Sequence, residues 1–598
     1  MSSMPVSTNT TSEPKDPTIN IVSRIRAIST THIGMRTVFY PIRAPENRLA
    51  AKNRKAKPIC YSCDVRKIHS SAWRLLFLSA GLQIIIFPLA GTYFYWLSWV
   101  AVAPLLVALR RAQSPEALQV DATVCLEPAS PWQAFLMAYA CGILWYLGTC
   151  YWVFDTMRHY GGLATPVALL VLVVACMYMG LYHGLFGLLF VLAAGNKILQ
   201  RRALALAPFL WVAVELARTR ISAFPWELLG YTQTNNPALT RLATFTGVYG
   251  LSFEIMLVNS VFAAAFLVPR ERRKWLLAAA CGGALILQAG QLLKPPPVPA
   301  DHTALLVQQN IPAEGNWTTD YFQGTLRDLT WISLHPPGAK DGQHFDLIVW
   351  PESPSPFFLN DASFRGVVAD LARQSQTWLL VGSIGVQSAS SSPQQQSEVF
   401  NSAGLISPTG ELAARYDKTH LVPFGEYIPF KRFLPFMSML TDQIGNFSWG
   451  HSRQPLEAGG QRLGISICYE SIFPDEVREY VQRDAGVLIN LTNDGWYGDS
   501  GAWKQHLEMT QMRAIENGRW LLVGTNTGMT VSVDPYGRIV AATGRKFRTA
   551  LAAPYGLLSG TTFYTEHGDW FAYLCAIISL GAIFVRLLFR NYERQPVS

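Results

Sequence analysis

Charged residues are scarce in this chain: only 15% of its 598 residues are Asp, Glu, Lys or Arg, and half are hydrophobic. A composition this apolar is unusual for a soluble enzyme, and the length allows several domains. The positive charge is also uneven. Residues 1–72 hold 12 Lys or Arg against 4 Asp or Glu, while the whole chain carries +9. The remainder is therefore almost neutral, which argues against a basic surface for nucleic acid.

Cysteine is rare too, which bears on disulfides and structural zinc. Of the nine cysteines, Cys468 alone falls in a segment that the pattern predicts to be soluble, so a disulfide there has no partner. Cys60 and Cys63 form a CxxC, but a structural zinc site needs four ligands and no second pair follows. We expect chance or local redox chemistry at that pair, and no metal site.

Long apolar windows fill much of the first half. No charge interrupts Leu75 to Leu109, which is long enough for two rather short helices at about 20 residues per membrane span. The pattern predicts eight spans in all, the fifth being the weakest because it is short and contains Glu215. The other windows are 132–154, 164–194, 203–218, 243–268, 275–293 and 571–589.

Basic loops follow every second span, at 110–111, 196–202 and 270–274. Lys and Arg mark the cytoplasmic side, so the N-terminus is predicted inside and residue 294 outside. This gives a basic, disordered cytoplasmic tail (1–72), a membrane domain with seven spans (73–294), an outer domain (295–568) and an eighth span with a short tail (569–598). Met35 is an alternative start.

After the stiff "KPPPVP" linker at 294–299 the pattern changes to short β-rich runs. Helical stretches such as 362–375 and 504–517 separate several of them. Strands that alternate with helices predict an α/β sandwich with a largely buried sheet. The runs lie at 304–308, 346–350, 378–382, 463–467 and 487–491.

Polar residues follow three of these runs. "DLIVWPES" carries Glu352, "LGISICYES" carries Cys468, and "VLINLTNDGWYG" carries Asn493. Between them, "RYDKTHLVPFGEYIP" supplies Lys418 and Glu426. Each residue alone has an ordinary reading as a packed thiol or a solvated loop residue. Their joint occurrence on loops after core-like strands favours an active site.

The residue types also suit one chemistry. A thiol with a pKa near ~8.5 needs a base or a cation to become nucleophilic. A carboxylate can take its proton, and a lysine can stabilise the oxyanion that follows attack. His420 and His506 follow no Cys–His–Asn pattern, which argues against a papain-like site.

"WPES", "YDKTHLVPFGEYIP" and "CYE" resemble the Glu–Lys–Cys triad motifs of the nitrilase, or carbon–nitrogen hydrolase, superfamily. The likeness continues through "NLTNDGWYG", "QMRAIENGRWLLVGTNTG" and "DPYGRI". Together with eight spans and "FPWELLGY" at 224–231, the chain from about residue 73 onward resembles the apolipoprotein N-acyltransferase family. That resemblance implies a nitrilase-like αββα sandwich beside a helical membrane domain.

The resemblance also implies roles for single residues. Cys468 would be the nucleophile, Glu352 the general base and Lys418 the group that holds the oxyanion. Glu426 would orient Lys418, Tyr469 would supply a backbone N–H, and Glu470 would order the loop around the nucleophile. The residues expected to contact the substrates are Trp317, Asn493 and Trp496.

By the same resemblance, an acyl chain would pass from a membrane phospholipid, through a cysteine thioester, to the free α-amine of an apolipoprotein's N-terminal diacylglyceryl-cysteine. The protein would be a monomer in the bacterial inner membrane with its catalytic domain in the periplasm, without cofactor or metal. One alternative is a membrane-anchored amidase of the nitrilase type. Another is a polytopic transporter, in which Glu215 and Glu254 would be functional carboxylates within the membrane.

Overall fold

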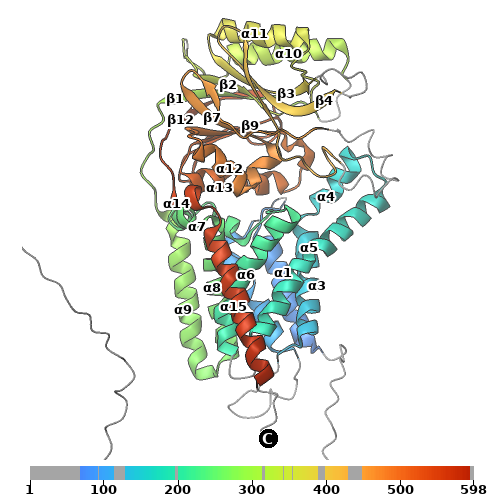
Figure 1. The fold of residues 1–598 in the computed structure, drawn as a ribbon, viewed down its shortest axis with the longest axis vertical. Helices are drawn as coiled ribbons and strands as arrows, with labels where there is room; N and C mark the ends of the chain where they lie inside the picture. Colours follow the sequence, from blue (N-terminus) through green and yellow to red (C-terminus); the bar gives the residue numbers. More distant parts are fainter. Residues whose placement is uncertain are drawn as a thin grey trace, which may run out of the picture. The chain divides into compact units, whose positions relative to one another are not determined.

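The computed structural model describes residues 68–592, apart from residues 90, 92, 341 and 353 and the stretches 113–127, 195–199, 313–316, 388–396 and 428–446. Nearly all of the predicted tail lies outside the described residues, as do Cys60, Cys63 and Met35. The interpretations of that segment stay predictions, as do the domain boundaries. The described residues form a helical part and a sheet-rich part (Figure 1).

Helices occupy every predicted apolar window. Two short segments fill 75–109, and α3 begins with Ser130 as its N-cap and Pro131 at its first position, both favoured at helix starts. The helices are α1 (Ser70–Ile85), the 3-10 helix η2 (Tyr95–Trp99) with α2 (Ala103–Arg110), α3 (Pro131–Thr149), α5 (Thr165–Ala194), α6 (Gln200–Ser222), α8 (Val248–Leu267), α9 (Arg270–Ala289) and α15 (Trp570–Tyr592).

Fewer of these helices than predicted are long and apolar enough to cross a membrane. Within the described residues four pass that test, in α5, α8, α9 and α15. A fifth is added if α3 counts with the bent segment that follows it. The prediction of eight is not met by this measure because α1 has 16 residues, the η2–α2 segment Tyr95–Arg110 is equally short, and α6 contains Glu215, Arg218 and Arg220.

The third predicted window is broken rather than continuous. After α3 the chain forms α4 (Trp152–Asp155) and then the π-helix η4 (Thr156–Tyr160), bent by 54° from α3. The expected single span 132–154 therefore ends at Thr149. π-Helical turns are rare and mark functional segments more often than ordinary helix does.

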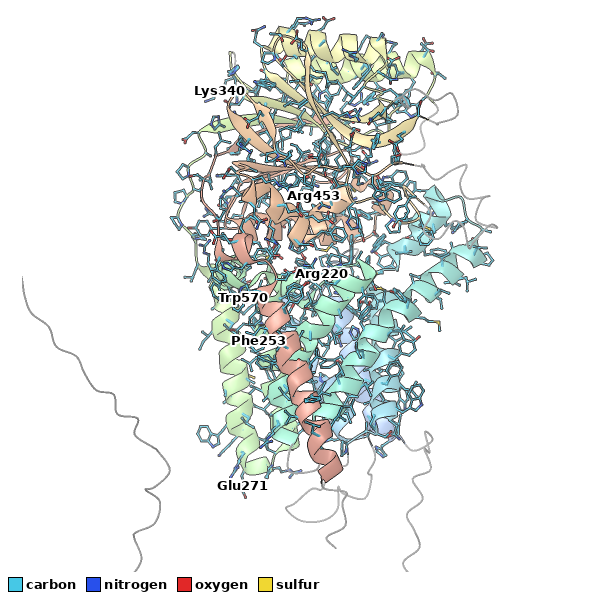
Figure 2. All side chains as sticks on the ribbon, in the orientation of Figure 1. Arg220, Phe253, Glu271, Lys340, Arg453 and Trp570 are labelled. Carbon is cyan, nitrogen blue, oxygen red and sulfur yellow. The ribbon has the colours of Figure 1, made fainter. Side chains whose placement is uncertain are left out.

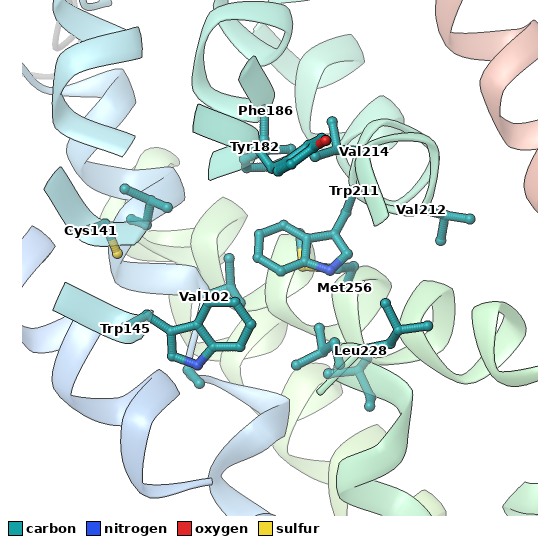
Figure 3. Packing of buried hydrophobic residues seen from close by; sticks show 14 of the residues in the cluster. Val102, Cys141, Trp145, Tyr182, Phe186, Trp211, Val212, Val214, Leu228 and Met256 are labelled. Atoms are coloured by element: carbon teal, nitrogen blue, oxygen red, sulfur yellow. The ribbon is translucent and has the colours of Figure 1, made fainter. Parts of the chain in front are cut away.

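Large aromatic side chains fill the interior between the helices. Trp145 of α3 and Trp211 of α6 are both buried, and the ring of Trp211 meets Phe186 of α5 edge to face at 5.0 Å (Figure 3). Each such aromatic removes about 150–250 Å² from solvent. The helices therefore pack on one another as a shared core, and the outward sides of α9 and α15 remain exposed.

In the sheet-rich part the described strands form two six-stranded sheets, ordered β12-β1-β2-β3-β4-β5 and β11-β10-β9-β8-β7-β6. The predicted α/β sandwich is confirmed. The strands are β1 (His302–Gln308), β2 (Leu347–Trp350), β3 (Trp378–Gln387), β4 (Glu398–Ile406), β5 (Leu412–Asp417), β6 (Leu456–Ala458), β7 (Gln461–Ile467), β8 (Val487–Thr492), β9 (Leu521–Thr525), β10 (Val531–Val533), β11 (Ile539–Ala542) and β12 (Thr549–Tyr555).

Alternation along β1 shows how the layers pack. Leu306 belongs to the buried cluster shared by both sheets, whereas Leu305 belongs to the cluster beneath the helices α10 (Thr319–Leu334) and α11 (Ala362–Ser375). Helices α12 (Pro474–Gln482) and α13 (Ala502–Asn517) cover the second sheet (Figure 1). Successive strand residues point to opposite faces, so a sheet with helices on one side and a sheet on the other must be apolar on both.

Strand direction places the ends of several strands together. β7, β8 and β9 are parallel, with Ile467 opposite Leu491 and Thr492 opposite Thr525. Their carboxyl ends therefore share one edge of the second sheet, and Cys468 follows β7 there. β1, β2 and β3 are likewise parallel in the first sheet, where Glu352 comes just after β2.

Polar contacts join the two parts. Arg220, near the end of α6 and labelled in Figure 2, bonds Asp475 of α12 and Asp569, which precedes α15. Trp226 Nε1 donates to Gln505 Oε1 of α13 at 2.9 Å. α13 thus lies against both the second sheet and the loop at 224–231.

Candidate active site

Cys468 lies at a sharp change of direction. It ends the run of β7 and opens the 3-10 helix η11 (Cys468–Ile472), with a φ of 51°. A residue with a Cβ rarely takes this left-handed conformation, and such strain concentrates at functional sites. The thiol is buried, and burial together with Glu352 raises its pKa although Lys418 acts in the opposite direction. The thiol is therefore protonated at rest.

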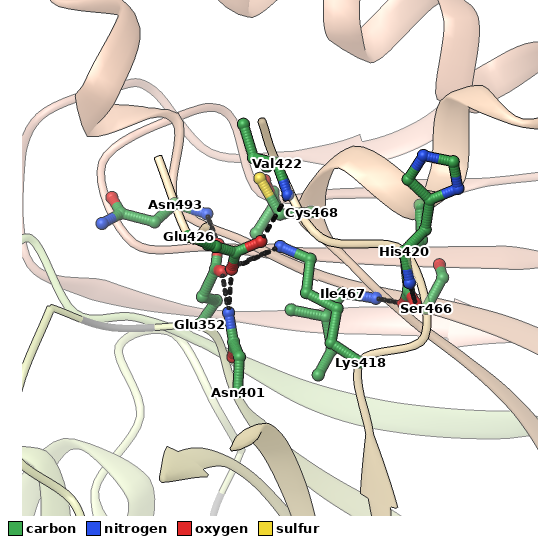
Figure 4. A network of polar contacts seen from close by, with 12 residues as sticks. Glu352, Asn401, Lys418, His420, Val422, Glu426, Ser466, Ile467, Cys468 and Asn493 are labelled. Carbon is green, nitrogen blue, oxygen red and sulfur yellow. Dashed lines mark hydrogen bonds and ion pairs between the residues drawn. The ribbon is translucent and has the colours of Figure 1, made fainter. Parts of the chain in front are cut away.

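Lys418 reaches the same place from the end of β5. Its Nζ lies 2.9 Å from Glu426 Oε1 and 3.6 Å from Glu352 Oε1 (Figure 4). Burial alone would lower the pKa of Lys418, but the two carboxylates raise it above its ordinary value. The lysine is therefore a fixed cation inside the site.

Asn401 of β4 binds both glutamates. Its Nδ2 donates to Glu352 Oε1 at 2.8 Å and to Glu426 Oε1 at 2.7 Å. Backbone N–H groups hold the other oxygens, from Asn493 to Glu352 and from Val422 to Glu426. Asn401 is absent from the residues that the sequence predicts, although an amide in the apolar strand 398–406 was a signal that could have found it.

The segment that carries Glu352 lies close to β3. A Cβ added to Gly382 would be 2.2 Å from the carbonyl oxygen of Pro351, so glycine is required there for the chain to pass. This contact sets the position of the glutamate relative to the sheet.

Glu470 lies in the buried turn after Cys468 and joins it to the loop after Lys418. It accepts hydrogen bonds from the backbone N–H groups of Ile467 (2.7 Å), Thr419 (2.6 Å) and His420 (3.0 Å), and from the hydroxyl of Tyr416 (2.8 Å). Burial raises the pKa of Glu470 despite these donors. The carboxyl thus ties the turn at Cys468 to the loop after Lys418.

The remaining predicted residues, which are Tyr469, Trp317, Trp496 and Asn493, differ in the contacts that they make. The Tyr469 hydroxyl donates to the carbonyl of Ala223, in the helical part. Trp317 packs in an aromatic group with Phe357 and its neighbours, and the half-exposed Trp496 packs on Tyr160 of η4. The Asn493 side-chain oxygen accepts from Gly495 and Asn526, so it is the backbone of Asn493 that faces Glu352.

Histidine, cysteine and carboxylate side chains do not form a metal centre in the described part of the chain. No group of three or more of them is arranged to hold an ion there. The polar groups near Cys468 instead bind one another: Asn401 bonds both glutamates, and Lys418 bonds Glu426.

Two family profiles match separate stretches of the chain. The "Apolipoprotein N-acyltransferase N-terminal domain" matches residues 79–261, and "Carbon-nitrogen hydrolase" matches residues 303–553. An apolipoprotein N-acyltransferase from Geobacter metallireducens is 34% identical over 526 residues, which are 86% of this chain and 94% of that protein. The chain belongs to the apolipoprotein N-acyltransferase family.

A second relative, the apolipoprotein N-acyltransferase of Methylococcus capsulatus, is 34% identical over 77% of this chain and 88% of its own. A carbon–nitrogen hydrolase of known structure from Helicobacter pylori G27 aligns with 50% of this chain and 95% of its own, at 16% identity and a TM-score of 0.31. As a member of the apolipoprotein N-acyltransferase family the chain is an acyltransferase, and Glu352, Lys418 and Cys468 all lie within its carbon–nitrogen hydrolase match. The amidase and transporter alternatives are not favoured.

Proposed function

We propose that this acyltransferase takes an acyl chain from a membrane phospholipid and transfers it, through a thioester on Cys468, to the α-amine of an apolipoprotein's N-terminal diacylglyceryl-cysteine. The observation that carries the proposal is the buried cluster of thiol, lysine and two glutamates. It stands in a chain that aligns with 94% of an apolipoprotein N-acyltransferase.

In the first step the Cys468 sulfur attacks the ester carbonyl carbon of the phospholipid, and Glu352 takes the thiol proton. The carbonyl oxygen becomes an oxyanion, which the Lys418 cation stabilises with backbone N–H donors. The carbon–oxygen bond then breaks, the lysophospholipid alkoxide recovers the proton from Glu352, and the thioester remains. Because burial and Glu352 raise the pKa of Cys468, the thiol holds its proton at rest and needs Glu352 to take it for attack.

In the second step the free amine attacks the thioester carbon. Glu352 takes a proton from the amine, Lys418 again holds the oxyanion, and the carbon–sulfur bond breaks. The departing sulfur recovers its proton, and an amide is left on the apolipoprotein. Both steps use the same three side chains in the same positions, so no rearrangement of the site is needed between them.

The other predicted residues support these groups in the proposal. Glu426 holds Lys418, Glu470 orders the loops, and Tyr469 contributes its backbone N–H beside the nucleophile. Trp317 and Trp496 are proposed to contact the lipid chains. Asn493 acts through the backbone N–H that bonds Glu352.

We place the enzyme in the bacterial inner membrane as a monomer, with residues 295–568 on the periplasmic side. Basic residues at 110–111, 196–202 and 270–274 support a cytoplasmic location for those loops. We propose that all eight helical segments lie in the membrane, since the short α1 and η2–α2 segments pack within the same apolar core as the longer helices.

The function is tested by incubating the purified protein with phospholipid that carries a labelled acyl chain. We expect a labelled thioester on Cys468 that persists until a diacylglyceryl-cysteine peptide with a free amine is added. An N-acetylated peptide should not discharge it, and Cys468→Ser should form no thioester. Rapid release of labelled fatty acid without peptide would favour a hydrolase, and a thioester on another cysteine would contradict the assignment.

A further inference from the structure

A buried histidine–aspartate pair contacts the backbone of Cys468. His506 belongs to α13, and its Nδ1 lies 3.1 Å from Oδ1 of Asp494, which follows β8. Its Nε2 lies 3.3 Å from the carbonyl oxygen of Cys468. Both side chains are almost fully buried. The reaction proposed above uses neither of them.

The Cys468 carbonyl is where the strained backbone is held. A φ of 51° is unfavourable for cysteine, and such a conformation persists only when its surroundings fix it. Three side chains lie within hydrogen-bond distance of this one carbonyl oxygen: Ser471 Oγ donates to it at 3.0 Å, Asn490 Nδ2 donates at 3.3 Å, and His506 Nε2 lies 3.3 Å away. The direction of the thiol depends on that peptide, because the Cβ and the carbonyl share the same Cα.

Asp494 contacts the ring of His506 on the side opposite to Cys468. Nε2 of His506 lies 3.2 Å from Ser471 Oγ as well as 3.3 Å from the Cys468 carbonyl oxygen, so the ring is placed to bond this carbonyl directly when Nε2 carries the proton. The Asp494 oxygen that faces Nδ1 also accepts from Thr492 Oγ1 at 3.3 Å. The carboxylate therefore orients the ring so that Nε2 points at Cys468.

The helical part closes over the pair. The ring of Trp226 lies parallel to that of His506, with 6.4 Å between centroids and 4° between planes. Trp226 also bonds Gln505, the neighbour of His506 on α13. Hydrogen bonds shielded from water in this way are stronger than exposed ones.

We propose that His506 and Asp494 are positioning residues for acyl transfer: His506 holds the Cys468 carbonyl, and so the backbone that aims the thiol, while Asp494 holds the ring of His506. This inference rests on the proposed role of Cys468 as nucleophile. The inference also explains why a histidine lies near Cys468 without a Cys–His–Asn pattern: its ring faces the carbonyl oxygen of Cys468 instead of the sulfur.

The test compares His506→Leu, His506→Asn and His506→Gln. A glutamine amide nitrogen falls near the position of Nε2, whereas that of asparagine falls near Nδ1. We expect the rate of thioester formation to fall about 10- to 100-fold in the Leu and Asn variants and to stay within about 5-fold of wild type in His506→Gln. The KM for phospholipid should change less than about 3-fold, since substrate binding is untouched.

His302→Leu is the matched control. His302 pairs with Asp346 at 3.0 Å at the start of β1, so this variant loses a partly exposed histidine–aspartate pair away from Cys468 and should react within about 2-fold of wild type. Thermal unfolding of each variant is measured alongside. If His506→Leu fails to fold, the comparison of Asn with Gln decides.

Two results would overturn the inference: a His506→Gln variant as slow as His506→Asn, or a His506→Leu variant that keeps the wild-type rate. Failure of the proposed function looks different. Thioester formation that survives in Cys468→Ala would reject the nucleophile itself. An inactive Cys468→Ala variant beside unaffected His506 variants would reject only the positioning role.

Discussion

The charges around Cys468 do not balance. Glu352 and Glu426 bring two negative charges and Lys418 one positive charge. A site with a negative surplus disfavours a thiolate, which agrees with the raised pKa of Cys468. In the reaction proposed above, the thiol therefore holds its proton until Glu352 takes it, and Lys418 stabilises the oxyanion more than the resting sulfur.

The rate at which Cys468 is alkylated should show how the neighbouring charges affect its thiol. Glu352 raises and Lys418 lowers the pKa of the thiol. We therefore expect the iodoacetamide reaction to rise with pH, with a midpoint that moves down in Glu352→Gln and up in Lys418→Gln. The pH dependence of the alkylation rate measures both, with Cys468→Ala as the background from the other cysteines. Midpoints that move in the opposite order would contradict the assigned charges.

Thioester formation should be sensitive to a negative charge at position 401. Asn401→Asp would place a third carboxylate within about 3 Å of Glu352 and Glu426, where like charges repel strongly. We expect thioester formation to slow by at least about 100-fold while the protein stays folded. Asn360→Asp makes the same change at an exposed position and should react normally. Equal rates in the two variants would show that Asn401 does not hold the glutamates.

At the scale of elements, α13 carries buried acids between the two parts. Burial raises the pKa of Glu508 to about 7, although Lys504 and Tyr93 act in the opposite direction. One of its oxygens accepts from the Tyr93 hydroxyl, and the other has no hydrogen-bond partner among the described residues. An uncharged carboxyl suits this environment better than a charged one.

Stability should therefore depend on pH through Glu508. Between its ordinary pKa of 4.5 and about 7, the folded protein keeps a proton that the unfolded chain releases, so stability falls as pH rises across that window. We expect the unfolding temperature of Glu508→Gln to exceed that of wild type at pH 8. The difference between the two proteins should be smaller at pH 5. Thermal unfolding in detergent measures it, with the exposed Glu411→Gln as a control that should show no such difference.

Elements were more predictable than the contacts between them. The runs at 304–308 and 463–467 became β1 and β7 because a buried strand needs a continuous apolar run. Glu352 and Cys468 could be chosen because each follows such a strand, and Lys418 because it stands in the loop motif "YDKTHLVPFGEYIP". Asn401 and His506 could not, since their partners come from distant segments and no local pattern records them. The break after Thr149 was missed because hydropathy carries no signal for a bend between two apolar segments.

At the scale of the molecule, the two parts form one packed unit instead of a domain on a tether. Arg220 binds both Asp475 and Asp569, and Glu516 of α13 accepts from the N–H of Val248 at the start of α8. The catalytic sandwich is thereby fixed against the ends of the helices. A lipid-anchored substrate gains from such a site, because confinement near the reacting groups raises its effective concentration.

The proposed orientation can be measured by labelling single cysteines in an otherwise cysteine-free protein. Asp320→Cys, at an exposed position on α10, should react with an impermeant reagent in intact cells, and Arg202→Cys on α6 should not. Arg202→Cys should react once the membrane is permeabilised. Labelling of Asp320→Cys only after permeabilisation would reverse the orientation inferred from the basic loops.

The π-helix η4 should make residues 156–160 unusually sensitive to the insertion or deletion of a residue. Thr156 Oγ1 donates to the carbonyl of Trp496, and the Tyr160 hydroxyl donates to that of Gly495, in the loop whose backbone also holds Glu352. A π turn holds one residue more than an α turn. Deleting a residue from 156–160 would restore regular helix and rotate the following side chains by about 100°. In genetic terms, substitutions at the intervening residues 157–159 should be tolerated far more often than insertions or deletions within 156–160.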